Sequence, residues 1–166
     1  MGWFGMTLIE ILELLPKDHP NRPKLIAQVQ QLVKAWSNFQ DKKTGLWYQV
    51  VNRVDDPSNW LETSSTSMYT FTIARAVDRG YVDKSYMKVA NAGYAGVLTK
   101  ISLGREDAMP YLSDICEGTN VADLPYYYAR KRLVNDLHGL GAFLIMNEKF
   151  MNKKLKGSTR GFWQAK

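Results

Sequence analysis

Cysteine and histidine are scarce in this chain of 166 residues, which limits both its cross-links and its chemistry. The single cysteine, Cys116, cannot form an internal disulfide, and no Cys or His at metal-ligand spacing surrounds it. We therefore expect no metal site and no cofactor, and we predict that Cys116 is a small buried apolar residue. The CxxC, HExxH, GxGxxG and P-loop motifs are also absent from the sequence.

Long apolar runs are missing as well. No stretch approaches the ~20 residues of a membrane-spanning helix, so no membrane partner is expected. The first residues lack a basic start and carry Glu10 and Glu13 inside their apolar stretch, which is not typical of a signal peptide. A cytoplasmic location is favoured, although an upstream start would leave the export route open.

The net charge of +6 is concentrated at one end. Residues 152–166 hold five basic side chains and no acidic one, so residues 1–151 carry only +1. We read 1–151 as one folded body and 152–166 as a basic, solvated tail, and we do not expect nucleic acid as a partner. The run "YYYARKRL" mixes aromatic and basic residues, so a nucleic-acid-associated helical protein remains a rival interpretation.

Apolar residues, at 45% of the chain, suffice for a folded core, and their spacing predicts an all-α fold. The expected helices cover about 2–15, 25–39, 64–79, 86–101 and 137–151. The first, third and last helices are apolar or rich in small residues, whereas the other two have a polar, solvent-exposed face. This pattern predicts an inner and an outer layer of helices. "TGLWYQVV" suggests a short strand, residues 103–133 read as irregular, and the long loops should gather at one end.

Five segments in order resemble the C-terminal half of unsaturated glucuronyl and rhamnogalacturonyl hydrolases, glycoside hydrolase families 88 and 105. They are "MGWFGMTLIEILELLPKDHPNR", "FQDKKTGLWYQVV", "NWLETSSTSMYTFTIARAVDRGY", "SDICEGT" and "NDLHGLGAF". The resemblance implies an (α/α)6 barrel of twelve helices. Five expected helices make the chain part of such a barrel, about half. Met1 would then correspond to a methionine in the middle of the family's chain.

The resemblance also implies a chemistry. The family removes an unsaturated uronic acid by hydrating its C4=C5 double bond, with an Asp as general acid and base. That Asp, and a His and an Arg that contact the sugar, precede the "MGW" motif. We therefore expect no catalytic residue in this chain: the family's acid/base Asp would lie upstream of Met1, and the chain alone would lack its proton donor.

Two tryptophans are implied by the resemblance to flank the sugar: Trp3 in "MGW" and Trp47 in "GLWYQ". Flat rings suit a flattened sugar because its C–H faces pack on π faces. Core packing is the alternative for each ring. Trp36 lies on a regular apolar stripe and is expected in the core. The sequence does not decide between core and pocket for Trp60 and Trp163.

Ser64 and Ser65 lie in "ETSSTS", where a long loop enters an inner helix. Free N–H groups at that helix start could receive a uronate carboxylate, and the two hydroxyls could add hydrogen bonds. Plain capping by Thr63 or Ser64 is an equally good explanation. "NDLHGLGAF" poses the same choice: Asp136 and His138 either cap a tightly packed helix or contribute to the pocket wall.

The sequence thus predicts a glycoside hydrolase-type protein whose partner is an unsaturated uronic acid oligosaccharide from rhamnogalacturonan or pectin. A non-catalytic helical sugar-binding or scaffold module is the alternative. Half of a barrel would leave the faces of inner helices open to water, forfeiting about 25 cal/mol per Å² of buried apolar area. We therefore expect a homodimer or a separate N-terminal half to cover them.

Overall fold

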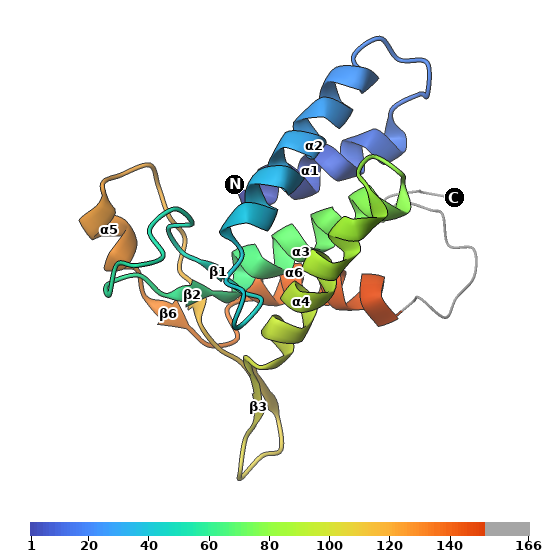
Figure 1. Cartoon of the computed structure of the whole chain (residues 1–166). Coiled ribbons are helices and arrows are strands. Elements are labelled where there is room, and N and C mark those ends of the chain that lie inside the picture. The colour runs from blue at the N-terminus through green and yellow to red at the C-terminus, as the bar shows by residue number, and fades with distance from the viewer. Residues whose placement is uncertain (152–166) are drawn as a thin grey trace.

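The computed structural model describes residues 1–151, and helices dominate that part of the chain (Figure 1). The helices are α1 Gly2–Leu14, α2 Arg22–Phe39, α3 Thr63–Asp78, α4 Met87–Leu98, α5 Leu124–Tyr128 and α6 Leu137–Met151, with a 3₁₀ turn, η1 Lys84–Tyr86, before α4. The five helices expected from the sequence are all present, close to their predicted bounds. The predicted tail, 152–166, and Trp163 lie outside the described residues.

Helix α3 is the centre of the described fold because it packs against α1, α2, α4 and α6. Twelve of its residues are buried, several of them Ser or Thr. Their hydroxyls bond back to the preceding turn: Ser67 donates to the Thr63 carbonyl (2.9 Å) and Thr72 to the Met68 carbonyl (2.8 Å). These small side chains allow neighbouring helices to approach α3 on several sides.

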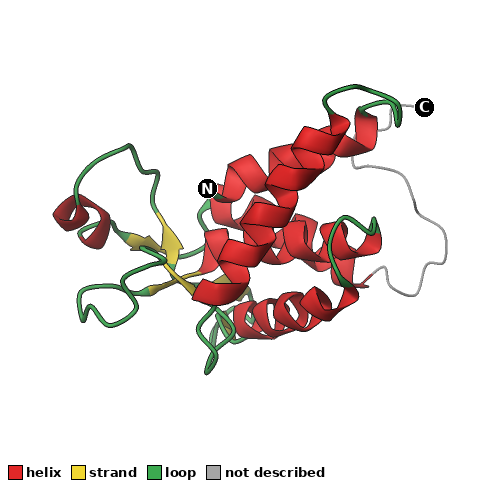
Figure 2. Ribbon diagram, turned by 45° about the horizontal axis from the view of Figure 1, so that its top comes forward, coloured by secondary structure: helices red, strands yellow, loops and turns green. Residues whose placement is uncertain are grey.

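The helices form two layers. Helices α1 and α6 flank α3, whereas α2 packs on α1 and α3, and α4 packs on α3. Figure 2 shows the long helices together on one side of the short strands. Helix α2 buries only Val29, Val33 and Trp36, which is the single apolar stripe expected of an outer helix. This arrangement confirms the predicted division into inner and outer helices and the core position of Trp36.

Short strand pairs extend from one end of the helices. They are β1 Trp47–Tyr48 with β2 Leu61–Glu62, β3 Ile101–Leu103 with β4 Pro110–Leu112, and β5 Ile115–Cys116 with β6 Arg132–Leu133, all antiparallel. The stretch 103–133 was expected to be irregular, but pairing of its short segments builds two of these hairpins and α5. The pairs β1–β2 and β5–β6 meet beside the start of α3, so the long loops do gather at one end.

The other end of α1 is fixed by charge. The buried Glu13 carboxylate accepts a hydrogen bond from Nε of Arg79 (2.7 Å), and Arg75 lies 3.8 Å from it. Arg22 Nη1 donates to two carbonyl oxygens at the C-terminal end of α1 (2.7 and 2.8 Å), which closes that helix end. These contacts join the C-terminal end of α1 to α2 and α3.

Candidate functional site

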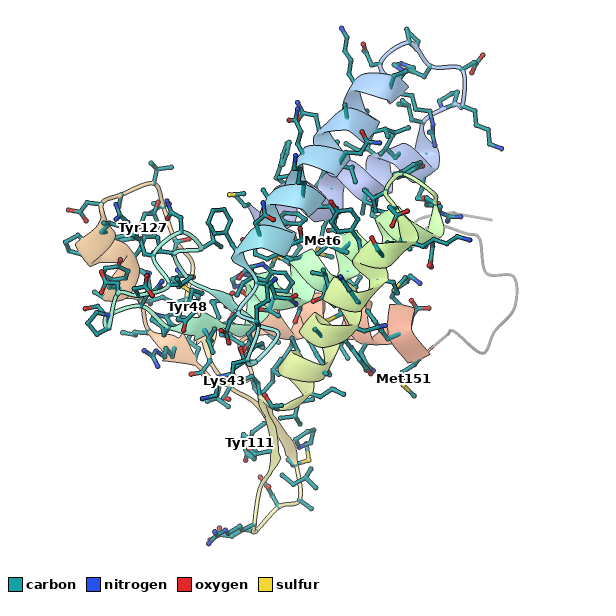
Figure 3. All side chains as sticks on the ribbon, viewed as in Figure 1. Met6, Lys43, Tyr48, Tyr111, Tyr127 and Met151 are labelled. Carbon is teal, nitrogen blue, oxygen red and sulfur yellow. The ribbon has the colours of Figure 1, made fainter. Side chains whose placement is uncertain are left out.

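The N-terminal ends of α1, α3 and α6 converge on a pocket of about 270 Å³. The β5–β6 hairpin and α5 border the same pocket, and Figure 3 shows Tyr127 of α5 at that end of the molecule, away from Met151 at the far end of α6. The residues of the wall that carry the argument below are Trp3, Gln49, Glu62, Ser65, Tyr69 and His138. This size suits one sugar residue better than a long chain.

Trp3 provides the flat surface of the pocket. Its side chain is 51% exposed, although it belongs to a helix that is otherwise strongly apolar. Its ring lies 6.0 Å from the ring of His138, at an interplanar angle of 29°. The two rings come from α1 and α6, so residues 135 positions apart in the chain form one stacked platform at the pocket.

Trp47 corrects an expectation. Its side chain is 0% exposed, its indole Nε1 donates to the Trp36 carbonyl (2.8 Å), and it is not part of the pocket wall. The ring of Tyr69 packs edge-on against Trp47 and face-on against Trp36, at 5.5 and 4.4 Å. Trp47 is therefore a core residue behind Tyr69, and Tyr69, not Trp47, borders the pocket.

Glu62 was not singled out from the sequence, yet it organises the site. Its carboxylate is almost fully buried and accepts hydrogen bonds from Ser64 N, Ser64 Oγ and Cys116 N (2.9, 2.7 and 2.9 Å), and also from Ser65 N. The negative charge thus lies at the N-terminus of α3, where the helix dipole stabilises it. Through Cys116 N it also ties β5 to α3.

This cap changes the interpretation of Ser64 and Ser65. Their backbone N–H groups are occupied by the carboxylate of Glu62, which corrects the expectation that they are free to receive a uronate. The capping alternative holds, with Glu62 as the capping residue in place of Thr63 or Ser64. Thr63 instead donates its hydroxyl to the Ser113 carbonyl (2.7 Å). Ser64 and Ser65 still border the pocket.

In the segment "NDLHGLGAF", one residue caps the helix and another borders the pocket. Asp136 Oδ1 accepts a hydrogen bond from His138 N (3.2 Å) and lies 3.5 Å from its Nδ1, but Asp136 does not border the pocket. His138 does border it. Asp136 therefore caps α6 and orients the imidazole of His138, and only His138 lies in the wall.

Two ionisable groups at the pocket stay protonated near neutral pH. Burial, and then the charge of Glu62, raise the pKa of Cys116 to about 12, and the same two causes raise the pKa of Tyr69 to about 12. Cys116 accepts a hydrogen bond from Gln49 Nε2 (3.0 Å) and donates to the Glu117 carbonyl (3.2 Å). Since the thiolate is the nucleophilic form, Cys116 has a structural role, as predicted for a buried residue.

Within 1–151 no group of three or more His, Cys, Asp and Glu side chains is placed to hold a metal ion. No helix in the same range combines the length and apolarity needed to cross a bilayer.

Trp60, whose role the sequence left undecided, is buried, and the Arg132 guanidinium lies 4.8 Å from its ring centroid.

The described residues thus form layered helices with a polar pocket and an aromatic platform at the N-terminal ends of α1, α3 and α6. Comparison with known proteins gives the family: the model of glycosyl hydrolase family 88 matches residues 1–152, and the chain belongs to that family. The Agrobacterium fabrum protein Atu3128 is 26% identical over 159 residues, which cover 87% of this chain and 67% of that protein. A 24.9 kDa protein in the picA locus of Rhizobium radiobacter gives the same values.

Solved structures agree on the fold. A glycoside hydrolase from family 105 of C. acetobutylicum ATCC 824 superposes with a TM-score of 0.85 at 29% identity, over 91% of this chain and 44% of that one. A possible family 105 member from Klebsiella pneumoniae superposes with a TM-score of 0.79 at 26% identity, over 92% of this chain and 38% of that one. The chain thus spans less than half the length of these enzymes, which confirms the prediction of a partial (α/α)6 barrel.

Proposed function

We propose that the pocket binds the terminal unsaturated uronic acid of a rhamnogalacturonan- or pectin-derived oligosaccharide. The observation that carries this proposal is the half-exposed Trp3 ring stacked beside His138 over a polar wall. An aromatic face accepts the flattened sugar ring, while the amide of Gln49 and the hydroxyls of Ser65 and Tyr69 offer hydrogen bonds to its edge.

The charges in the pocket are compatible with an anionic sugar. The carboxylate of Glu62 is surrounded by hydrogen-bond donors, and the carboxylate of Glu117 lies 3.2 Å from the Arg130 guanidinium. Both negative charges are therefore offset inside the protein. Membership of glycosyl hydrolase family 88 supports a carbohydrate as the ligand, and the terminal unsaturated uronide is the finer part of the proposal.

We further propose that the proton donor for the reaction comes from outside the described pocket. Hydration of the C4=C5 bond requires an acid that protonates one alkene carbon while water adds to the other; the hemiketal then opens and the glycosidic bond breaks. Glu62 and Glu117, the two carboxylates of the pocket lining, both have partners within the protein, Cys116 N for Glu62 and the Arg130 guanidinium for Glu117, which supports an acid from elsewhere. The chain alone would then act as a sugar-binding module, which is also the second candidate function.

A titration of the chain with an unsaturated uronyl-rhamnose disaccharide tests the binding proposal. We expect saturable binding, and we expect Trp3→Ala to weaken it about five- to thirtyfold, because the lost ring contact contributes roughly 1–2 kcal/mol. Phe39→Ala removes an exposed aromatic ring at the end of α2 that is not part of the pocket lining, and should leave the affinity unchanged. Equal affinity of the wild type and Trp3→Ala would overturn the proposed site.

A further inference from the structure

Helix α1 carries an exposed apolar stripe opposite its buried face. Phe4, Ile11 and Leu14 are exposed along it, while residues such as Ile9 and Leu12 on the other side are fully buried. Phe4 and Ile11 are seven residues apart and Leu14 follows three later, so the three side chains lie on one side of the helix. A helix that is apolar on both sides needs neighbours on both sides.

Helix α6 carries the matching stripe. Leu137, Leu144 and Met151 recur at intervals of seven, and Leu137 and Leu144 are 84% and 61% exposed. Gly141 lies between the two leucines, and a Cβ added there would meet nothing within 4 Å. The stripe is thus a heptad-spaced ridge with a gap in its middle, into which a side chain of a second helix can fit.

A groove joins the two helices. It measures about 350 Å³ and is lined from α1, α3 and α6 by Trp3, Met6, Ile11, Leu14, Phe71 and Ile145. Among the described residues that line the groove, Glu10 is the only charged one, and it lies 3.4 Å from Arg75, so its charge is offset by a neighbouring helix. A fully exposed large side chain presents about 200 Å². With the exposed fractions of the residues in the two stripes, the open apolar area is roughly 700 Å².

We propose that these stripes form the interface with a second copy of this chain, which packs α1 of each copy on α6 of the other. Helices α1, α3 and α6 all begin at the sugar pocket, so they run in one direction, and a two-fold axis parallel to them keeps that direction in both copies. Three inner helices from each copy then complete a ring of six. The assembly goes beyond the proposed function and does not depend on it.

Area and size both favour a second copy. The open apolar area approaches the ~800 Å² per partner of a stable interface. This chain covers 67% of the 24.9 kDa relative from Rhizobium radiobacter but only 44% of the solved family 105 structure from C. acetobutylicum. That relative is therefore also far shorter than the solved barrel. Bulky Phe4 and Ile11 on α1 and the gap at Gly141 on α6 provide complementary shapes, as in knobs-into-holes packing.

The molar mass in solution, measured by sedimentation equilibrium over a range of concentrations, tests the assembly. We expect twice the chain mass of 19.0 kDa for the wild type. Leu144→Lys and Gly141→Trp should halve the mass, and Gly141→Trp should do so without unfolding the chain, because the space around it is open. Leu103→Lys, which changes an equally exposed leucine on the β3–β4 hairpin, should leave the mass doubled.

The pairing of helices has its own test. Thr7→Cys on α1 and Gly141→Cys on α6 are prepared as separate proteins, and we expect a disulfide-linked species to form efficiently only when the two are mixed. The buried Cys116 does not compete. A monomeric wild type at all concentrations would overturn the inference and favour a separate half-barrel as the occupant. A mass unaffected by both α6 variants, or polydisperse aggregates, would overturn it too.

Discussion

Replacing Glu62 by Ala is expected to destabilise the described fold by about 3–5 kcal/mol. The substitution leaves the N–H groups of Ser64, Ser65 and Cys116 without their shared acceptor in a buried environment, and each buried unpaired donor costs roughly 1–3 kcal/mol. It also removes the negative charge at the N-terminus of α3. Urea unfolding followed by circular dichroism would report the loss as a lower transition midpoint.

Asp83→Ala provides the matched control for that experiment. Asp83 also caps a helical turn, since its carboxylate accepts a hydrogen bond from Ser85 N (2.8 Å), but it is exposed and joins no other element. An exposed cap contributes about 1 kcal/mol, so Asp83→Ala should move the midpoint much less than Glu62→Ala does. Equal shifts for the two variants would show that Glu62 is an ordinary cap and that it does not hold the pocket wall together.

Gly45→Ala is expected to be nearly as damaging, for a different reason. Gly45 has a positive φ of 76°, and a Cβ there would lie 2.2 Å from the Ala92 carbonyl oxygen of α4. That atom belongs to a helix backbone and cannot move aside by a rotamer change. We expect a loss of about 3 kcal/mol or more, measured by the same urea transition, because the turn after α2 must separate from α4.

Gly80→Ala isolates the backbone contribution. Gly80 has nearly the same φ, 70°, but a Cβ there would meet nothing within 4 Å. Its replacement should therefore cost only the strain of a left-handed residue, about 1–2 kcal/mol. If Gly45→Ala and Gly80→Ala were equally destabilising, the close approach of the turn to α4 would have no energetic importance.

Most of the helical fold could be predicted because helix periodicity is local. The spacing of Val29, Val33 and Trp36 indicates α2 directly, and the abundance of small residues in α3 indicates its central position. The strand pairs were harder to foresee. In the β5–β6 pair, Cys116 lies opposite Arg132, which is sixteen positions later in the chain. A strand of two residues is too short to show the alternation of apolar and polar residues that would reveal its partner.

The pocket could be predicted only in part. Trp3 and His138 were found, the first from the family resemblance and the second from its place at a helix start. Glu62 was missed because Ser, Thr, Asp and Asn are the usual N-caps, and because one of its four donors, Cys116 N, is 54 positions away in the chain. Trp47 was misplaced because a tryptophan whose N–H finds a buried carbonyl can be fully enclosed, and this partner is not visible in the sequence.

The central claim is that this chain holds the sugar-binding wall while the proton donor lies elsewhere. The ultraviolet absorbance of the C4=C5 double bond, followed while the chain is held with a saturating unsaturated uronyl disaccharide, tests that claim most directly. The account predicts that the absorbance stays constant although the sugar is bound. A steady fall in absorbance with the purified chain alone would contradict it, because a residue of this chain would then be the acid.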